Sequence, residues 1–377
     1  MSKNRNRSVL INGSNLHVGG GVAVASSFID CLSHIPHGNY DIHLLVSTEI
    51  DSNLKAFGTN VGVFKSYTVT DFYGISALWK GLHRYFTDMD VVFTVFGPAY
   101  FLRPITRHVF GFAQPQIIYP DNPSASRMPY WIRAKENLKY GLQKLFFCRA
   151  DRLIVELEHV QHKLEKLTLF KNIPIHVVHS CVHTIYHEKA KWAQVDLTES
   201  NHAIKLGIIS RNYPHKNLSL LPQLKSYLKN SLDLNVEFYV TFSQEEWRKC
   251  TEEFRSCINN VGSLRLNQCP TFYSLMDGVI FPSLLECFSA VPIESMMLKR
   301  PLFASDLPFV RDVCGDYCNY FDPLSVENIG NVISKYFGMS SDRRQAQIDE
   351  AFAHVQKFTD ATLRASRYLD VIEQAVQ

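Results

Sequence analysis

Short apolar runs alternate with longer amphipathic stretches along the first half of the chain. Such alternation predicts an α/β domain in which helices cover a parallel, doubly wound sheet. The expected strands are Ser8–Asn12, Asp41–Val46, Val61–Phe64, Val91–Val95, His108–Phe112, Arg152–Val155 and Pro174–Val178. The expected helices are Val22–Leu32, Ile75–Tyr85, Arg127–Phe147 and His159–Leu167.

The alternation pauses at residues 184–203, which are rich in charge and lack apolar periodicity, and then resumes. We therefore predict a first domain over 1–183, a linker over 184–203, a second domain over 204–357 and a terminal helix within 358–377. A length of 377 residues agrees with two domains better than with one core. The second-half strands are expected at 204–209, 236–242, 278–282, 301–304 and 319–321, and the last helices at 326–337, 342–355 and 362–375.

The composition is that of an ordinary globular protein, with 46% hydrophobic and 20% charged residues. The longest nearly uncharged apolar run, Val91–Leu102, is well short of the roughly 20 residues that cross a bilayer. The polar, basic start has no apolar signal-peptide region, so we expect a cytoplasmic protein. The nine cysteines show no C-x2-C spacing, which favours neither a disulfide framework nor a zinc site.

The net charge of +3 is divided unevenly along the chain. Residues 1–183 carry 19 Lys and Arg against 13 Asp and Glu, whereas residues 184–377 carry 20 against 23, so the first half should meet an anionic partner. The segment Arg127–Arg149 holds six basic residues against Glu136 alone, with apolar residues between them. It is either an amphipathic helix on an anionic membrane surface or an ordinary helix packed on the first sheet. No zinc spacing or RNA-binding motif accompanies it, so we expect no nucleic-acid partner.

Two carboxylates, Glu286 and Glu294, lie in the stretch Pro282–Glu294, directly after the apolar strand Gly278–Phe281. In a parallel sheet this junction is the carboxyl end of a strand, where ligands bind, and the next helix offers unpaired backbone N–H groups to an anion. Acceptor oxygens beside an anion site suit a ligand with phosphates and hydroxyls, such as a nucleotide sugar. A solvated helix face is the alternative for either glutamate taken alone.

Two cationic side chains share an earlier strand-to-helix loop. Arg211 and Lys216 both follow the apolar strand 204–209, and Pro214 and Asn217 predict a turn and a helix cap there. Such a loop can bring a guanidinium and an ammonium to one diphosphate. This is the requirement for a nucleoside-diphosphate leaving group, on which negative charge builds as the bond breaks.

The R-x4-K spacing of Arg211 and Lys216, followed by the E-x7-E spacing of Glu286 and Glu294, resembles the signature of retaining glycosyltransferases of family 4. The resemblance implies the GT-B fold, in which two Rossmann-like domains face each other across a cleft and the last helix returns to the first domain. It also implies that Glu286 holds the donor sugar, Glu294 the ribose, and the two cations the diphosphate. The anomeric configuration of the sugar would be retained.

This chain departs from the family pattern at Cys287 and Ser289, where glycines are common. The backbone N–H groups of Phe288 and Ser289 remain candidates for donor binding, and Ser289 is a candidate helix cap. The departure bears on the identity of the donor sugar more than on the class of reaction.

A glycine-rich loop, Gly19–Gly21, follows the first expected strand and opens the first helix. Glycines there allow the backbone to approach a phosphate or a sugar closely. A dinucleotide fingerprint fits poorly, because Val24 stands where its third glycine belongs. In the resembled family such a loop lies near the sugar and the diphosphate, so Gly20 and Gly21 are candidate donor-binding residues.

Three further residues are candidates for acceptor binding. Gln114 stands near the place where many relatives have a histidine beside the reacting sugar, while His108 lies at the start of its strand. Asp121 and Asn122 follow in a loop flanked by prolines. Structural roles are an alternative for all three.

The sequence therefore predicts a retaining, hexosyltransferase-like glycosyltransferase that moves a sugar from a nucleoside-diphosphate donor to a saccharide or lipid-linked acceptor, with cell-surface polysaccharides such as lipopolysaccharide as the setting. Asp88 and Asp90 mimic a metal-binding D-x-D, but they precede a strand as an ordinary acidic turn would. Because cationic groups can neutralise the diphosphate, we expect neither a metal nor another cofactor. The alternatives are a hydrolysing nucleotide-sugar epimerase on the same fold and a non-catalytic sugar-nucleotide-binding protein.

Overall fold

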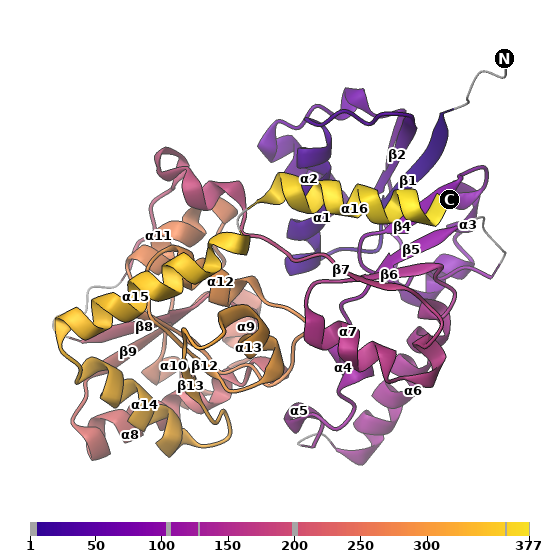
Figure 1. Cartoon of the computed structure of the whole chain (residues 1–377). Helices are drawn as coiled ribbons and strands as arrows, with labels where there is room; N and C mark the ends of the chain where they lie inside the picture. Colours follow the sequence, from indigo (N-terminus) through magenta and orange to yellow (C-terminus); the bar gives the residue numbers. More distant parts are fainter. Residues whose placement is uncertain (1–5, 103–106, 127–128, 198–202, 359, 377) are drawn as a thin grey trace. The chain divides into compact units, whose positions relative to one another are not determined.

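The computed structural model describes residues 6–102, 107–126, 129–197, 203–358 and 360–376. The chain forms two compact units, each with its own sheet (Figure 1). The first unit comprises residues 1–120, 129–181 and 360–377, and the second comprises 121–128 and 182–359. No helix within the described ranges is long and apolar enough to span a membrane.

The first unit is built on a parallel sheet, which has seven strands among the described residues in the order β3-β2-β1-β4-β5-β6-β7. Its central strands are almost wholly buried, because helices cover both faces of a doubly wound sheet. The strands are β1 Arg7–Gly13, β2 Tyr40–Val46, β3 Ser66–Val69, β4 Val91–Thr94, β5 His108–Gly111, β6 Arg152–Val155 and β7 Ile175–Val177. The helices and 3₁₀ turns are α1 Gly20–Leu32, α2 Thr48–Phe57, η1 Val61–Val63, η2 Gly74–Leu78, α3 His83–Phe86, α4 Pro115–Ile118, α6 Tyr130–Phe147, α7 Glu158–Glu165, η3 Thr168–Phe170 and the C-terminal α16 Ala361–Val376.

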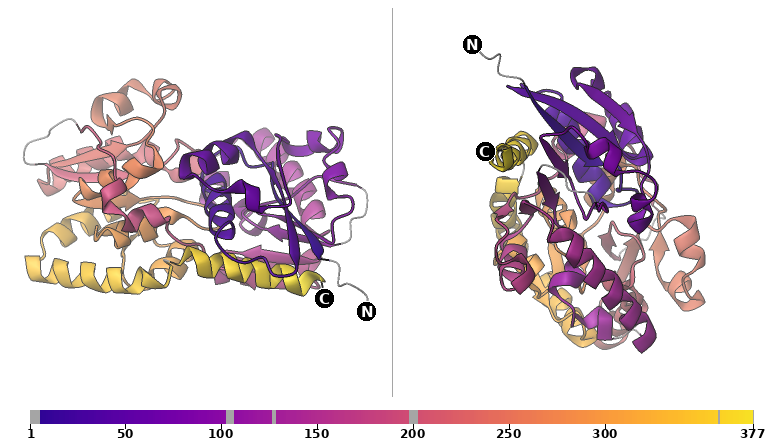
Figure 2. Two further views of the ribbon diagram at one scale, coloured as in Figure 1. Left: turned by 90° about the horizontal axis from the view of Figure 1, so that it is seen from above. Right: turned by 90° about the vertical axis from the view of Figure 1, so that its right-hand side faces the viewer.

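The last helix belongs to the first unit, as expected. Helix α16 packs against α1 and against strands β4, β5 and β6 (Figures 1 and 2). Its buried Tyr368 makes an edge-to-face contact with Phe28, at 5.0 Å between ring centroids, and a tilted contact with Phe93 at 5.3 Å. The C-terminal segment is therefore part of the core of a unit whose other residues lie far away in sequence.

The second unit has a parallel sheet of six strands among the described residues, in the order β10-β9-β8-β11-β12-β13. The strands are β8 Ile204–Ile208, β9 Val236–Val240, β10 Asn259–Asn260, β11 Gly278–Phe281, β12 Leu302–Ser305 and β13 Asn319–Phe321. The helices and turns are α5 Pro123–Ser126, η4 Thr184–His187, η5 Lys189–Lys191, η6 Pro214–Lys216, η7 Leu218–Leu220, α8 Leu221–Leu232, α9 Gln244–Arg248, α10 Glu252–Cys257, η8 Leu266–Gln268, α11 Cys269–Ser274, α12 Ala290–Met297, α13 Pro308–Cys314, α14 Val326–Phe337, α15 Ser341–Val355 and η9 Gln356–Phe358.

The segment expected as a linker carries structure where it is described. It forms η4 and η5, and Ala193 N donates to Asn267 O at 2.8 Å. The indole of Trp192 donates to Ile185 O at 2.8 Å, which folds the segment back on itself. Residues 198–202, in the predicted linker, and Arg127, at the start of a predicted helix, lie outside the described residues.

Two expected elements of the first unit were wrong, and one helix was missed. Val61–Phe64 is not a strand: it holds η1, where the Asn60 side chain accepts from Gly62 N, and the strand is the more polar β3 at the sheet edge. The helix expected over Ile75–Tyr85 is broken into η2 and α3, with Gly81 at φ 79° between them. Helix α2 was missed, although Ser47 caps it and acidic residues occupy its first turn.

A buried carboxylate lies at the end of β6 in the first unit. Glu156 is 5% exposed, and Arg364 of α16 is buried in the same unit and donates to Ser27 Oγ at 2.9 Å. Burial raises the pKa of Glu156 to about 7, while Ser180 and the charge of Arg364 moderate the rise. Glu156 thus carries a proton at mildly acidic pH that an exposed glutamate would have released.

This pKa predicts how the stability of the first unit depends on pH. Between about pH 4.5 and pH 7 the folded chain binds a proton at Glu156 that the unfolded chain has released, so the free energy of unfolding should fall as pH rises through this window. In Glu156→Gln, the free energy of unfolding should decrease over this window by up to about 3 kcal/mol less than it does in wild type. Melting temperatures of both proteins across the window, with the exposed Glu165→Gln as control, measure the effect. Parallel curves for wild type and Glu156→Gln would contradict it.

Candidate active site

In each sheet, the order in which the chain adds strands reverses at one pair of neighbouring strands. In the second unit the chain runs outward from β8 through β9 to β10 and then returns to β11 on the other side of β8. The loops that leave the carboxyl ends of β8 and β11 therefore diverge at a topological switch point, the place where parallel α/β sheets bind ligands. The first of these loops carries Arg211 and Lys216, and the second carries Glu286.

An ion pair joins these two loops. Lys216 Nζ lies 2.5 Å from Glu286 Oε1, and the two side chains are only 14% and 13% exposed. Ser283 Oγ donates to the same carboxylate oxygen at 2.8 Å, and the ammonium also lies 5.5 Å from the centroid of the Phe281 ring. Among the described residues these polar contacts converge on Oε1, which leaves Oε2 to accept from a ligand.

Backbone and side-chain contacts of His215 link the two loops. Leu284 N donates to His215 O at 2.7 Å, and Ser283 Oγ lies 3.3 Å from the same carbonyl. The His215 ring nitrogen Nε2 is 3.9 Å from Glu286 Oε1. Burial lowers the pKa of His215, the charge of Lys216 lowers it further, and Glu286 opposes both. The imidazole is therefore neutral at pH 7, so Lys216 supplies the positive charge at this point.

Asn217 occupies cap positions, as expected: it ends η6 and precedes η7. The residue adopts the left-handed conformation at φ 56°, which asparagine tolerates. Its buried side chain makes no capping bond but donates from Nδ2 to Pro323 O at 2.8 Å. Asn217 thus fixes the end of the lysine-bearing loop to a distant segment of the same unit.

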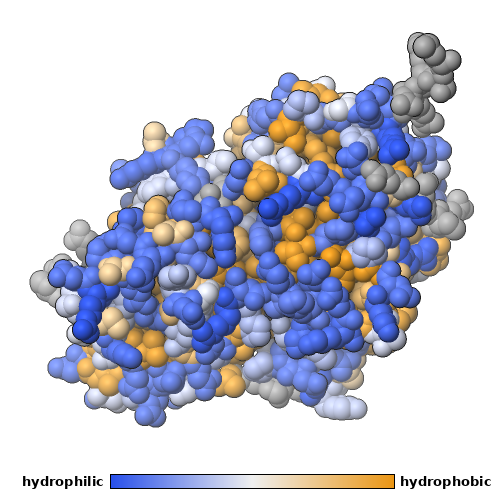
Figure 3. All heavy atoms as spheres, viewed as in Figure 1, coloured by the Kyte–Doolittle hydropathy of each residue, from blue (hydrophilic) through white to orange (hydrophobic). Residues whose placement is uncertain are grey.

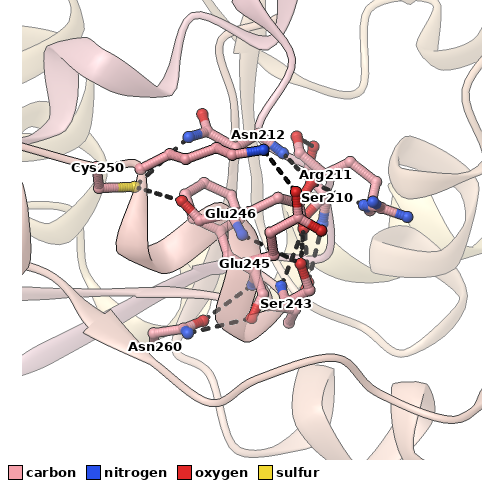
Figure 4. A network of polar contacts seen from close by, with 11 residues as sticks. Ser210, Arg211, Asn212, Ser243, Glu245, Glu246, Cys250 and Asn260 are labelled. Atoms are coloured by element: carbon pink, nitrogen blue, oxygen red, sulfur yellow. Dashed lines mark hydrogen bonds and ion pairs between the residues drawn. The ribbon is translucent and has the colours of Figure 1, made fainter.

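Arg211 lies in a second polar network in the same loop (Figure 4). Its Nε donates to Glu246 Oε1 at 2.7 Å, and Asn212 N donates to the same oxygen at 3.1 Å. The other oxygen of Glu246 accepts from the backbone and hydroxyl of Ser243, which completes a capping box at the start of α9. Burial would raise the pKa of Glu246, but these hydrogen bonds outweigh it and lower the pKa to about 2. The guanidinium therefore has a fixed, ionised partner.

Glu294 occupies the second turn of α12 and is partly buried. Tyr273 Oη donates to Glu294 Oε2 at 3.0 Å. Burial raises the pKa of Glu294, and the hydroxyls of Tyr186 and Tyr273 oppose that rise by favouring the ionised form. Tyr186 comes from η4, so the segment expected as a linker contributes directly to the surroundings of this carboxylate.

Helix α12 begins next to Glu286. Ser289 occupies the expected N-cap position, although its side chain makes no capping hydrogen bond. Phe288 and Ser289 are partly exposed, and the first turn of α12 has no acidic residue. The positive end of the helix dipole thus faces the loop without a carboxylate within its own first turn.

The glycine-rich loop lies at the equivalent switch point of the first unit, where β1 and β4 are neighbours. Asn15 Nδ2 donates to Phe96 O at 2.8 Å and so joins the loops after these two strands. Gly19 has φ 74°, which favours glycine, whereas a Cβ at Gly20 would meet nothing within 4 Å. At Gly21 a Cβ would lie 3.3 Å from the Leu16 side chain, so that glycine allows close packing.

The acceptor candidates have structural contacts of their own. Gln114 occupies the N-cap position of α4 in the first unit and makes no side-chain capping bond. Asp121 and Asn122 belong to the second unit, where Asn122 Oδ1 accepts from Ala125 N at 3.0 Å and shapes a turn. His108 is fully buried, and its Nε2 lies 2.8 Å from Thr94 Oγ1 in the core of the first unit.

Several site residues were missed in the sequence. The Ser243-x-x-Glu246 capping box is readable from its spacing, and Ser283 and His215 lie beside residues that were predicted. Tyr186 and Tyr273 gave no sequence signal, because only the fold brings them to Glu294. Within the described ranges, no three His, Cys, Asp or Glu side chains converge as a metal site would require.

Comparison with known proteins identifies the fold. No protein-family model and no curated protein match the chain in sequence. Sucrose-phosphate synthase from Thermosynechococcus elongatus matches in structure with a TM-score of 0.70 at 12% identity, over 98% of this chain and 99% of that one. The UDP-forming α,α-trehalose-phosphate synthase of Burkholderia vietnamiensis gives 0.65 at 9%, over 99% and 98%. A trehalose-6-phosphate synthase described for glycosyl transfer with retention gives 0.66 at 10%, over 98% and 99%.

The chain has the fold of these synthases. The α/β architecture predicted from the sequence, with a parallel sheet in each half, is thereby confirmed over nearly the whole length of the chain. At these identities the similarity establishes the fold and leaves the reaction to be argued from the residues of the site.

The ion pair predicts an energetic coupling between the two loops. Lys216→Met should destabilise the second unit, because it leaves a mostly buried carboxylate unpaired, and Glu286→Gln in the same chain should relieve that cost. The coupling energy between the two substitutions should be about 0.5–3 kcal/mol. A double-mutant cycle measured by denaturant unfolding determines it. Simple additivity of the two single effects would show that the contact contributes nothing.

Proposed function

We propose that this protein is a retaining glycosyltransferase, which transfers a sugar from a nucleoside-diphosphate donor to a hydroxyl group of a saccharide or lipid-linked saccharide. The observation that carries this proposal is the Lys216–Glu286 pair at the switch point of the second sheet, beside the start of α12. It puts a cation, a carboxylate and a helix N-terminus in one place. A nucleotide sugar offers the matching groups: a diphosphate and a hydroxyl-bearing ring.

Stabilisation of the departing diphosphate is the main catalytic task in this proposal. Lys216 and Arg211 supply positive charge from one loop, and the backbone N–H groups of Phe288 and Ser289 add the positive end of α12. Because the two cations are already fixed by contacts with Glu286 and Glu246, little reorganisation of their side chains is needed when charge develops on the leaving group. They balance the diphosphate without a metal ion in the proposed mechanism.

The two glutamates have separate tasks in this proposal. Glu286 accepts from hydroxyls of the donor sugar through Oε2, since Lys216 and Ser283 hold Oε1. Glu294 accepts from the ribose, with Tyr273 orienting its carboxylate. The glycines Gly20 and Gly21 contribute backbone contacts to the donor, and Gln114, Asp121 and Asn122 are the proposed acceptor-binding residues.

The known structures of the same fold support the class of reaction. One forms UDP during transfer and another is described as transferring with retention, so we propose a UDP-sugar as the first donor to test. We place the acceptor in cell-surface polysaccharide biosynthesis, including lipopolysaccharide. A thermal-shift screen of nucleotide sugars, followed by turnover with a panel of saccharide acceptors, tests this proposal. Hydrolysis or epimerisation of the donor without transfer would overturn it.

Loss of either cation should slow the reaction strongly. Lys216→Met and Arg211→Ala should each lower kcat/KM by about 10²-fold or more, because each removes one preorganised partner of the diphosphate. Steady-state kinetics with the donor found in the screen measures this effect. Lys299→Met and Arg311→Ala, which break ion pairs with Asp349 and Asp306 elsewhere in the same unit, are matched controls and should keep turnover. Near wild-type rates in both test variants would remove the assignment.

Substitution of the two glutamates should have different effects on the affinity for the free nucleoside diphosphate. Glu294→Gln should weaken its binding by about tenfold, since a ribose contact is lost. Glu286→Gln should bind it at least as tightly as wild type, because Lys216 is no longer neutralised by a carboxylate, yet transfer should fail. Calorimetric titration of both variants makes the comparison. An equal loss of affinity in the two would refute the division of roles.

A further inference from the structure

Helix α6 of the first unit turns an apolar face to solvent. Trp131, Leu138, Leu142 and Leu145 are 70%, 77%, 36% and 58% exposed. Their spacings of seven, four and three residues place all four on one side of an α-helix. An ordinary surface helix buries such a stripe, so its exposure is unusual for a protein that stays in free solution.

Another side of α6, next to the stripe and extending away from it, already attaches the helix to the unit. Gln143, Phe146 and Phe147 are buried, and Phe147 packs against Phe110 of β5 and against Phe112 just after it, at 5.7 and 4.9 Å between ring centroids. The exposed stripe is therefore a second apolar face, which the packing of the helix does not use. Figure 3 shows one face of the molecule, on which hydrophilic residues predominate and hydrophobic patches lie between them.

Basic side chains flank the apolar stripe. Lys135 and Lys139 are exposed and lie one helical turn apart beside it, and Arg133 and Lys144 lie farther round the helix. Glu136 is the single acidic residue of α6, so the helix carries a clear excess of positive charge. An apolar strip bordered by lysines is the arrangement of helices that lie in the interface of a membrane.

We propose that α6 docks on an anionic phospholipid surface. The helix lies flat, over roughly 27 Å of its length, with Trp131 and the three leucines at the level of the headgroups and acyl boundary. Lys135 and Lys139 contact lipid phosphates, whose charge complements theirs. A partner protein is less well matched, because protein interfaces are depleted in lysine at their centre. The contact is peripheral: the helix rests on the surface and does not span it.

This surface belongs to the first unit, whereas the Lys216–Glu286 pair lies in the second. The docking proposal therefore does not depend on the proposed reaction. Attachment to vesicles and nucleotide binding can be measured separately on the same preparation, so a negative result for one proposal does not contradict the other.

Flotation with vesicles tests the docking. We expect the full chain to bind vesicles of phosphatidylcholine with phosphatidylglycerol and to bind pure phosphatidylcholine at least tenfold more weakly. Binding should weaken as salt rises from about 0.1 M to about 1 M, over which the Debye length falls from about 10 to about 3 Å. The emission of Trp131 should shift to shorter wavelength on binding, and Trp131→Phe should lose most of the shift.

Two double variants separate the contributions of charge and apolar contact. Lys135→Glu with Lys139→Glu and, separately, Leu138→Ser with Leu142→Ser should each lower vesicle binding at least tenfold. The control is Lys229→Glu with Lys335→Glu, an equal change of charge on exposed lysines of the second unit, which should bind as wild type does. Unchanged melting temperatures and unchanged nucleotide binding show that the variants are folded.

Three results would overturn the proposal: equal binding of wild type to neutral and anionic vesicles, no binding to either, or equal losses in the control and the test variants. Concentration-dependent self-association that the Leu138→Ser, Leu142→Ser variant abolishes, without vesicle binding by wild type, would also overturn it and would make α6 an interface between copies of the chain.

Discussion

The ion pair between Lys216 and Glu286 is the contact on which the candidate site depends. Removing two charges from water is costly, and a largely buried pair is stable only if further hydrogen bonds satisfy it. Ser283 supplies one such bond, and the backbone bond from Leu284 to His215 holds the two loops at the required separation. The parallel pairing of β8 with β11 makes this arrangement possible, because it brings residues 70 positions apart to the same edge of the sheet.

The same pair sets the electrostatic state of the candidate site. Glu286 neutralises Lys216, and Glu246 neutralises Arg211, so neither cation is left as an uncompensated charge. A bound diphosphate would compete with these carboxylates for both cations. In the proposed reaction, this competition would limit the affinity for the bare nucleotide, while the fixed positions of the cations would favour a state in which leaving-group charge is greater. The proposed arrangement would therefore suit transfer better than tight storage of a nucleotide.

Most of the fold followed from the sequence, because buried parallel strands such as Val91–Thr94 and Gly278–Phe281 are continuous apolar runs that few other elements resemble. The failures have physical causes. Val61–Phe64 is apolar but contains Gly62 and is held as a 3₁₀ turn by Asn60, while the real edge strand Ser66–Val69 is only half apolar. At the site, Lys216 and Glu286 were expected to serve one ligand, but their direct contact was not foreseen. The partners Glu246, Tyr186 and Tyr273 depend on tertiary pairing, which no local pattern encodes.

Helix α6 is an element whose buried and exposed sides the sequence pattern could not predict. The apolar residues of Tyr130–Phe147 were visible in the sequence, and two opposite interpretations fitted them equally: packing on the sheet or contact with a membrane. Packing on the sheet is observed, and contact with an anionic membrane is our proposal for the exposed side of the helix. Phe146 and Phe147 attach it to the unit, whereas Leu138 and Leu145 face outward. Removing a hydrophobic side chain from water is favourable, but the sequence pattern does not say where the side chain will be buried. Only the fold determines whether it packs in the protein core or remains exposed to contact another apolar surface.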